Sequence, residues 1–410
     1  MTAASAAAPP ERAALIGAAR RSARQARPRP VDPAAPVLPV ARVAVDLPLA
    51  HLDRSFDYEV PASLSAAAQP GTRVRVRVAG RELDGFVLER SAGSDFAGSL
   101  QRLRRVVSPE PVLDAEVLQL ARRVAERYAG TLADVLRLAV PPRVAKVEAE
   151  PVQVPQLLPP PAPEPGEWAA YSGGPEFLAA LAGQAAPRVV WAALPGSDWA
   201  GALARAVQGA LAAGRGALVV VPDGRDVAAV DAALTALLGS GWHVALTADL
   251  GPRERYRRWL ALRRGAVRGA VGTRAAMFAP VRDLGLVVVW DDGDDALAEP
   301  RAPYPHAREV LCLRAHQSGA AALVGGYART AEGELLLRTQ WAHPLVAERP
   351  VVRAAAARVL PAGDDEELVR DAAAASARLP TLAWQVARDA LGRGPVLVQV
   401  PRRGYLPALA

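Results

Sequence analysis

The chain has 410 residues, of which 51% are hydrophobic but only 5% aromatic, so alanine, valine and leucine must supply most of its core. Its formal net charge of +7 at pH 7 favours an anionic partner, nucleic acid first, although a solvated basic surface without a specific partner fits the same composition. The single cysteine, Cys312, excludes an internal disulfide, a CxxC redox motif and a cysteine-rich zinc site, and we expect a buried, inert thiol.

The first 39 residues are rich in Ala, Pro and Arg, and we expect a disordered basic tail over 1–39. They lack the apolar core of a signal peptide. No apolar run in the chain approaches the roughly 20 residues that a membrane span needs. We therefore predict a cytoplasmic, nucleoid-associated protein without a membrane partner.

A β-rich domain is predicted over 40–140. The run 73–78 alternates Arg and Val, so the valines face a core while Arg73, Arg75 and Arg77 line the other face. That arginine row fits contact with DNA phosphates and fits an ordinary wet face equally well. A second strand follows at 85–88, and helical spacing of apolar residues predicts a helix over 114–138.

Proline-rich residues 141–187 predict an extended linker, after which apolar runs alternate with helical stretches over 188–395. The valine runs at 218–221 and 286–289 lack alternation, as is typical of parallel strands buried on both faces. This pattern predicts a doubly wound α/β domain. Its expected strands lie at 188–192, 217–221, 243–247, 266–271, 286–290, 321–324 and 396–400.

An arginine-rich stretch at 252–264 predicts a helix with Tyr256, Trp259 and Leu260 on an apolar edge. It fits a helix that follows a phosphate backbone, and it fits a solvated basic face with a packed tryptophan.

Lysine is almost absent from the chain. Nucleotide-binding α/β domains place a lysine ammonium against the β- and γ-phosphates from a glycine-rich loop. The one lysine, Lys146, lies in the proline-flanked stretch before the α/β domain. The α/β domain therefore cannot bind ATP in the usual way.

Several ordered motifs resemble those of the PriA family of replication restart proteins. They are LDRSFDYEVP at 52–61, PGTRVRV at 70–76, GTRAAMFAP at 272–280, HARE at 306–309 and RRGY at 402–405. The resemblance covers about 40–410. It implies a small β-rich domain that binds the 3′ end of DNA over 40–140, followed by a RecA-like helicase lobe over 188–395.

In that family the β-rich domain holds the 3′-terminal nucleotide of the leading strand in a small pocket. The resemblance assigns the 3′-OH to Asp57 and a pocket wall to Phe56, and it places Tyr58 among the residues that bind the 3′ end. It assigns close backbone approach to Gly80 and phosphate contact to Arg104. From the residues alone, an aromatic pair in a small barrel with Asp57 capping a turn is the simpler interpretation.

The ATPase motifs depart from the family pattern. Its Walker A loop aligns with 195–200, where Gly196 and Ser197 match the family pattern. Asp198 replaces the last glycine of the motif, Trp199 replaces the lysine, and Ala200 replaces the Mg²⁺-binding threonine. The acidic box becomes Asp291 and Asp292, without its glutamate and histidine. Asp291 could still reach a metal, but we favour an acidic turn that caps the following helix.

Other family features are altered too. The G-S-A-T-P coupling motif becomes GGYAR at 325–329, and the aromatic-rich loop keeps Tyr304 and His306 without its tryptophan. We expect His306 to be structural. The linker is too short for the winged-helix domain that many relatives carry, and we interpret 396–410 as the truncated start of the zinc-binding and second-lobe region.

These features predict a protein that binds stalled or branched replication forks at a leading-strand 3′-OH and starts replication restart as a primosome component, without helicase activity. Forked and single-stranded DNA are the expected ligands, and the resemblance adds primosome proteins and single-stranded DNA-binding protein. We expect no cofactor, since the zinc of the family lies in the missing region and ATP binding is doubtful. The alternatives are an ATP-dependent 3′–5′ helicase with a non-standard nucleotide site and a replication scaffold without fork preference.

Overall fold

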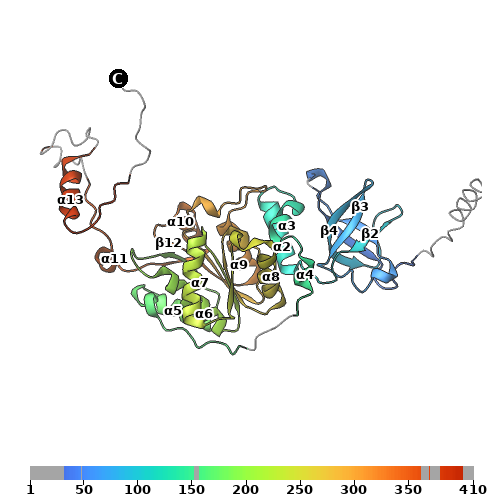
Figure 1. Cartoon of the computed structure of the whole chain (residues 1–410), viewed down its shortest axis with the longest axis horizontal. Helices are drawn as coiled ribbons and strands as arrows, with labels where there is room; N and C mark the ends of the chain where they lie inside the picture. Colours follow the sequence, from blue (N-terminus) through green and yellow to red (C-terminus); the bar gives the residue numbers. More distant parts are fainter. Residues whose placement is uncertain (1–31, 48, 152–156, 362–368, 370–378, 400–410) are drawn as a thin grey trace, which may run out of the picture. The chain divides into compact units, whose positions relative to one another are not determined.

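The computed structural model describes residues 32–47, 49–151, 157–361, 369 and 379–399. The chain divides into two compact units, 1–351 and 352–410. The first unit holds a β-rich domain, a helical segment and a parallel-sheet lobe (Figure 1).

The β-rich domain is one six-stranded sheet with the strand order β5-β2-β1-β4-β3-β6. Its strands are β1 (Val40–Val45), β2 (Phe56–Glu59), β3 (Arg73–Val78), β4 (Arg81–Ser91), β5 (Gln101–Arg102) and β6 (Arg105–Val106). The 3-10 helices η1 (Ala50–Leu52) and η2 (Ala62–Leu64) flank β2. Val74 and Val76 are fully buried, so the valine face of β3 fills the core as predicted.

The sequence predicts a disordered tail over 1–39, but the structure shows residues 32–39 in contact with the β-rich domain. Residues 1–31 lie outside the described residues. Ala35 is buried, its N–H donates to the Val60 carbonyl at 2.8 Å, and Ala34 bridges to Pro61. Backbone pairing with the β2 end therefore orders this stretch, which composition alone does not reveal.

The helical segment after the β-rich sheet is broken, whereas the sequence predicts one helix over 114–138. Helices α2 (Ala115–Arg127) and α3 (Leu132–Ala139) replace it, and the short α4 (Ala145–Glu148) follows them. The break falls at Ala129, whose φ is 50°, and at Gly130, where a Cβ atom would lie 2.3 Å from Pro303. Close packing against a distant loop therefore ends α2.

The lobe contains a parallel sheet with the order β13-β7-β12-β11-β8-β10-β9. Its strands are β7 (Arg188–Ala192), β8 (Gly216–Val220), β9 (His243–Leu246), β10 (Gly269–Gly272), β11 (Leu284–Trp290), β12 (Ala321–Gly326) and β13 (His343–Leu345). Six predicted strands and the α/β class are confirmed. The short β13 was not predicted, and described residues 396–399 form no strand.

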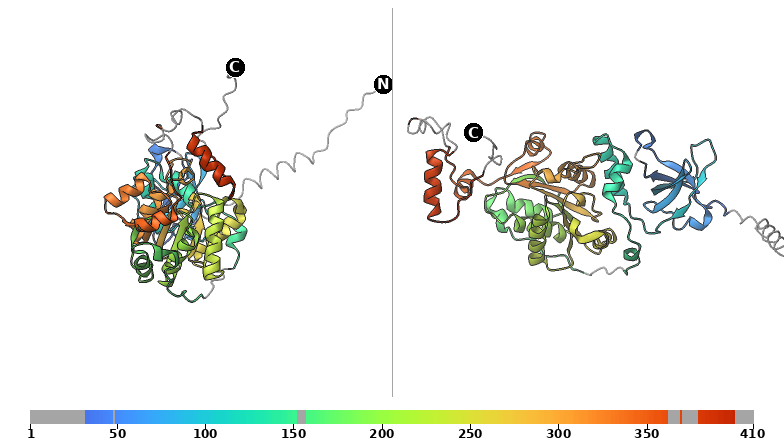
Figure 2. Two further views of the ribbon diagram at one scale, coloured as in Figure 1. Left: turned by 90° about the vertical axis from the view of Figure 1, so that its left-hand side faces the viewer. Right: turned by 45° about the horizontal axis from the view of Figure 1, so that its top comes forward.

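Helices cover both faces of this sheet (Figure 1; Figure 2). Val219 and Val288 face a core shared with α5 (Gly174–Ala182), α6 (Trp199–Ala212) and α7 (Gly224–Leu238). The alternate residues Leu218 and Val287 face a core shared with α8 (Gly251–Arg264), α9 (Ala307–Ser318) and the helical segment. The lobe also includes α10 (Ala331–Arg338) and the 3-10 helices η4 (Ala248–Leu250), η5 (Arg274–Ala276) and η6 (Asp295–Leu297).

The predicted linker 141–187 is partly folded. The 3-10 helix η3 (Gly166–Ala170) and α5 lie within it, and Trp168, Tyr171 and Phe177 are buried in the lobe core. The Trp168 indole N–H donates to the Ala202 carbonyl at 2.9 Å. These contacts reach residues far along the chain, so proline content could not predict them. Residues 152–156 lie outside the description.

Helix α8, the arginine-rich stretch predicted over 252–264, faces the helical segment. Arg264 pairs with Glu110 at 2.7 Å, Arg257 with Glu150 at 2.7 Å, and Arg263 with Asp114 at 3.0 Å. Tyr256 and Trp259 are buried beside them. The arginines named here therefore already have carboxylate partners in the same chain, which favours the interpretation as a basic face with a packed tryptophan.

A buried ion pair joins α2 to α9. Arg314 is fully buried, and its guanidinium donates to both carboxylate oxygens of Glu116, at 3.0 and 2.9 Å.

Glu116→Ala is expected to lower the free energy of unfolding by roughly 1–3 kcal/mol, because among the described residues the buried Arg314 guanidinium keeps only the Met277 carbonyl as acceptor. Urea unfolding checks this, with the exposed Glu126→Ala of the same helix as control; equal midpoints for the two variants would contradict it.

The second unit includes most of α11 (Arg349–Ala355) and all of α13 (Thr381–Leu391), where Trp384 and Val386 are about half exposed. Residues 400–410, which carry the RRGY motif, lie outside the described residues. Within the described ranges no helix has the length and apolarity of a membrane span, and no three His, Cys, Asp or Glu side chains are grouped to hold a metal ion.

Candidate nucleic-acid interface and degenerate nucleotide site

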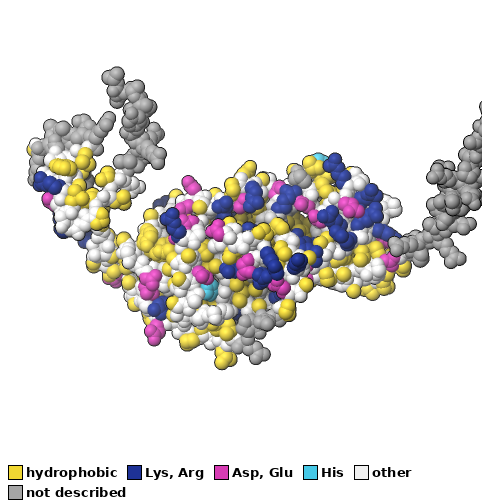
Figure 3. Space-filling view, in the orientation of Figure 1, with side chains coloured by type: hydrophobic (Ala, Val, Ile, Leu, Met, Phe, Trp, Pro, Cys, Tyr) yellow, Lys and Arg dark blue, Asp and Glu magenta, His cyan; other side chains and the backbone are white. Residues whose placement is uncertain are grey.

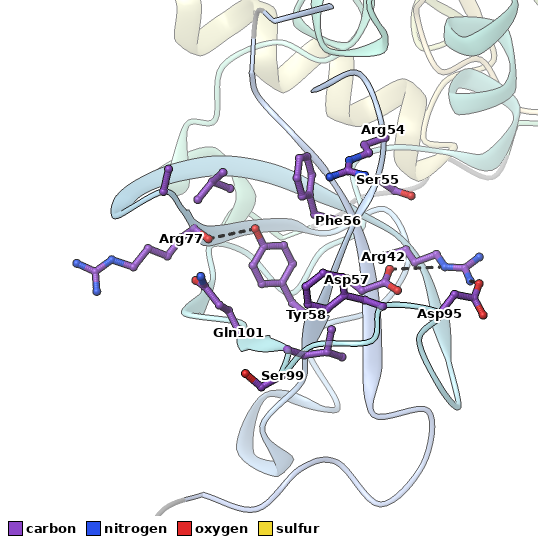
Figure 4. Close-up of a pocket in the computed structure, with 14 residues that line it drawn as sticks. Arg42, Arg54, Ser55, Phe56, Asp57, Tyr58, Arg77, Asp95, Ser99 and Gln101 are labelled. Atoms are coloured by element: carbon purple, nitrogen blue, oxygen red, sulfur yellow. Dashed lines mark hydrogen bonds and ion pairs between the residues drawn. The ribbon is translucent and has the colours of Figure 1, made fainter. Parts of the chain in front are cut away.

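A cavity of about 620 Å³, here called the β2 pocket, opens on the β-rich domain (Figure 4). Its volume is in the range of small-ligand sites. Strand β2 and the loop before it, the β3–β4 turn and the loop before β5 supply its walls. The lining residues are Arg42, Arg54, Ser55, Phe56, Asp57, Tyr58, Arg77, Val78, Ala79, Asp95, Phe96, Ser99, Leu100 and Gln101.

Asp57 is the acidic group of β2 in this pocket. Its side chain is 17% exposed; one carboxylate oxygen lies 3.6 Å from Arg42 Nε, and the other accepts from the Ser94 hydroxyl. Arg42 also pairs with Glu89 at 2.5 Å, which fixes its position beside Asp57. A carboxylate held in this way has lone pairs left for a hydroxyl donor that enters the pocket.

The aromatic residues on either side of Asp57 have different environments. Tyr58 is buried, and its hydroxyl donates to the Arg77 carbonyl at 3.2 Å; burial raises the pKa of Tyr58 to about 12. Phe56 is half-buried, with the Arg54 guanidinium 5.4 Å from its ring centroid. Tyr58 therefore braces the turn after β3, and Phe56 supplies a partly open aromatic wall.

The loop between β4 and β5 adds residues that the sequence analysis missed. Phe96 is 64% exposed and lines the pocket, while Ser94 and Asp95 reach Asp57 and Arg42. The sequence offered one signal for Phe96, a phenylalanine within a Gly/Ser-rich loop, because aromatic rings in loops are common stacking platforms for unpaired bases. Arg42 had no local signal, since its role follows from the pairing of β1 with β2.

Gly80 and Arg104 are not among the residues that line the β2 pocket. Ala79 and Gly80 form the β3–β4 turn with φ values of 46° and 83°, and a Cβ atom on Gly80 would meet nothing within 4 Å. The exposed Arg104 lies between β5 and β6, where its N–H donates to the Arg75 carbonyl at 3.1 Å. Their predicted DNA contacts stay predictions.

The three arginines of β3 divide between two cavities. Arg77 lines the β2 pocket and, in Figure 4, extends away from Asp57. Arg73 and Arg75 line a second cavity, where Arg75 pairs with Asp84 at 2.9 Å. Lys and Arg side chains gather on the visible face of this domain (Figure 3), and Arg42, Arg54 and Arg77 line the β2 pocket together with Asp57 and Asp95.

In the loop aligned with Walker A, an aspartate caps the helix that follows. Asp198 caps α6, with its carboxylate accepting the Gly201 N–H at 2.9 Å, and Gly196 supplies the preceding turn with φ 74°. A helix N-terminus binds phosphate through its free N–H groups, and here a carboxylate of the chain itself occupies that position. Ser197 donates its hydroxyl to the Leu194 carbonyl, and Ala200 is buried without a hydroxyl.

Trp199, at the lysine position, belongs to an aromatic cluster. Its ring stacks on Trp290 with centroids 4.5 Å apart and an interplanar angle of 3°, and Tyr327 meets the same Trp290 edge-on at 5.4 Å. Trp191 continues the cluster from β7, at 5.3 Å from Trp290. Rings from the three altered motifs or their flanks therefore pack together in one cluster.

The acidic box is engaged in structural contacts. Asp292 is buried; it pairs with the buried Arg308 at 3.1 Å and accepts from the Thr330 hydroxyl at 2.7 Å. Asp294 caps η6 by accepting the Ala296 N–H at 2.7 Å, so the expected capping turn is confirmed, with Asp294 as the capping residue. Burial, followed by the charges of Asp294 and Asp292, raises the pKa of Asp291.

Two further predictions concern single residues. His306 caps α9 by accepting the Arg308 N–H at 3.2 Å, which confirms its structural role, while Tyr304 is 64% exposed. Cys312 is half-buried and not fully buried as expected, and partial burial raises the pKa of its thiol to about 12, which favours the protonated thiol at neutral pH.

A small β-rich domain followed by a parallel-sheet α/β lobe is the class of protein that this architecture defines. Residues 42–141 match the model of the family described as the PriA 3′DNA-binding domain. The probable replication restart protein PriA of Mycobacterium bovis is 58% identical over 367 residues, which are 89% of this chain and 56% of that protein. Its counterpart from Mycobacterium leprae is 55% identical over 371 residues, with 89% and 57% covered.

More distant relatives carry the same name. The replication restart protein PriA of Treponema pallidum is 27% identical over 289 residues, covering 67% of this chain and 42% of that protein. The chain thus spans a little over half the length of its mycobacterial relatives. The resemblance to PriA inferred from the motifs is confirmed over most of the chain.

Proposed function

We propose that the protein binds stalled or branched replication forks through a leading-strand 3′-OH end and helps to start replication restart. The observation that carries this proposal is the placement of Asp57 and Phe56 in one pocket of a domain that matches the 3′DNA-binding model. The Asp57 carboxylate is positioned to accept the terminal 3′-OH, and Phe56 and Phe96 offer rings to the base.

The proposed binding mode predicts discrimination between chemical ends. A 3′-OH is a donor for a carboxylate, whereas a 3′-phosphate brings additional negative charge against Asp57. Arg42, Arg54 and Arg77 line the same pocket and would meet the backbone of the strand, so general DNA affinity and end preference come from different residues.

We further propose that the lobe neither binds nor hydrolyses ATP and serves as a scaffold. The support is chemical: Asp198 covers the helix N-terminus, Trp199 stacks on Trp290, and Asp292 is neutralised by Arg308. The positions of the Walker A lysine and threonine hold Trp199 and Ala200, so this loop offers neither a cation nor a hydroxyl there for a nucleotide phosphate or its Mg²⁺. Recruitment of primosome proteins and single-stranded DNA-binding protein, at the chromosome in the cytoplasm, completes the proposed role.

Calorimetric titration with MgATP tests the scaffold proposal. We expect no saturable heat at millimolar nucleotide and no ATP hydrolysis above background when forked DNA is added. Saturable binding, or hydrolysis that DNA stimulates, would instead support the helicase with a non-standard nucleotide site.

The same forks distinguish the proposal from a scaffold without fork preference. We expect tighter binding to a fork with a 3′-OH end at the junction than to duplex DNA of equal length at the same salt concentration. Equal affinities that fall together as salt rises would indicate contact with the phosphate backbone alone.

A further inference from the structure

A second cavity, here called the α3 cavity, lies between the arginine face of β3 and the segment α3–α4. Its volume is about 560 Å³, which suits a nucleotide-sized ligand. Phe86, Leu136 and Val140 supply apolar wall, and Arg73, Arg75 and Arg105 supply positive charge.

Two of the arginines in the α3 cavity have no carboxylate partner. Arg75 pairs with Asp84, Arg137 with Asp46 and Arg143 with Glu148. Within the described part of the chain, Arg73 and Arg105 take part in no ion pair. The cavity therefore keeps uncompensated positive charge.

Arg73 is the more constrained of these two arginines. It donates to the Pro141 carbonyl, its guanidinium carbon lies 5.0 Å from the Phe86 ring centroid, and its buried Nε has no acceptor. Burial lowers the pKa of Arg73. A half-buried guanidinium with an unused donor and no counter-ion favours an anion in the cavity.

The α3 cavity and the β2 pocket lie along one strand. Residues 73, 75 and 77 lie on the same face of β3. Arg77 lines the β2 pocket, and Arg73 lines the α3 cavity. Four residues of strand span about 13 Å. A stacked DNA strand advances about 3.4 Å per nucleotide, so this distance corresponds to about four nucleotides.

We propose that the α3 cavity binds an unpaired nucleotide about four positions upstream of the 3′ end, with its phosphate on Arg73 and Arg105 and its base on the apolar wall. This rests on the proposed function, in which the β2 pocket holds the terminal nucleotide. The uncompensated arginines suit a phosphate and the apolar wall suits a base, so the cavity fits a nucleotide better than a bare phosphate.

The test is the affinity of the full chain for single-stranded oligothymidylates of two to eight nucleotides with 3′-OH ends, measured by fluorescence anisotropy. We expect a step of about tenfold in affinity when the length passes four to five nucleotides. Replacing the base at that position by an abasic unit is expected to remove the step. Affinity that rises smoothly with length, or an abasic unit without effect, would overturn the proposal.

Two variants assign the step to the cavity. Arg73→Ala and Arg105→Ala are each expected to remove most of it and to reduce the slope of log affinity against log salt by about 0.7. Arg81→Ala is the matched control, because Arg81 is exposed on the adjacent strand and lines neither cavity. Arg105 is exposed as well, so its variant should fold even where Arg73→Ala proves unstable. A step that survives both variants would contradict the assignment.

The ratio of affinities for 3′-OH and 3′-phosphate ends, read on the same samples, tests the β2 pocket alone. Equal affinities for the two ends, together with an intact step in affinity at four to five nucleotides, would refute the proposed function. The same result would leave the nucleotide site in the α3 cavity standing. Thymidine monophosphate that competes for the step at micromolar concentration would show a free-nucleotide site and overturn the assignment to the DNA strand.

Discussion

Asp57→Ala is expected to weaken binding to forks with a leading-strand 3′-OH by about 10- to 100-fold. The variant removes a charge-assisted hydrogen bond of about 1.5–3 kcal/mol, and about 1.4 kcal/mol corresponds to a factor of ten. Binding to forks with a 3′-phosphate should change little or improve, because the repelling carboxylate is gone. The preference for a 3′-OH end should therefore disappear. Titration of labelled forks carrying each end measures both effects.

Glu82→Ala is the matched control for Asp57→Ala. Glu82 is exposed on β4 and does not line the β2 pocket, so its variant removes one negative charge from the same domain without touching the site. We expect unchanged end preference in Glu82→Ala. If Asp57→Ala keeps the preference of the unaltered chain, Asp57 does not bind the 3′-OH.

Asp292→Ala is expected to lower the free energy of unfolding by about 3–5 kcal/mol, because it leaves the buried Arg308 without its closest carboxylate. Glu309 at 3.5 Å and Glu332 at 3.4 Å offset part of the loss, which favours the lower end of this range. The Thr330 hydroxyl also loses its acceptor. Urea and thermal unfolding measure the change.

The neighbouring Asp291→Asn is the control for this prediction. Asparagine tolerates the positive φ of 51° at this position, and burial already disfavours the charged form of Asp291. We expect a change of about 1 kcal/mol or less. If Asp292→Ala is as stable as Asp291→Asn, then the pair with Arg308 does not hold this turn, and a catalytic role for Asp292 would need to be reconsidered.

The lobe was the part of the fold most accessible from sequence. Runs such as 286–289 lack alternation because the strand is buried on both faces, and that signal is local. The break between α2 and α3 was missed because it depends on the approach of Pro303 to Gly130. The folded half of the linker was missed for a similar reason, since Trp168 is buried by residues of α6.

The candidate site, like the fold, was predicted from the sequence only where the signal was local. The motif at 52–61 predicted Phe56, Asp57 and Tyr58, which the structure brings to one pocket. Arg42 and Phe96 come from another strand and a loop, so their roles depend on sheet pairing. The sequence indicated that Trp199 removes the lysine charge, but the stack of Trp199 on Trp290 requires two distant segments to meet.

The most direct test of the central claim compares the unaltered chain on three forks at one salt concentration, with and without MgATP. The forks carry a leading-strand 3′-OH at the junction, a 3′-phosphate there, or no leading strand. We predict tightest binding to the 3′-OH fork, about tenfold or more over the other two, and no effect of MgATP. Equal affinity for all three forks, or binding that changes with MgATP, would contradict the proposed function.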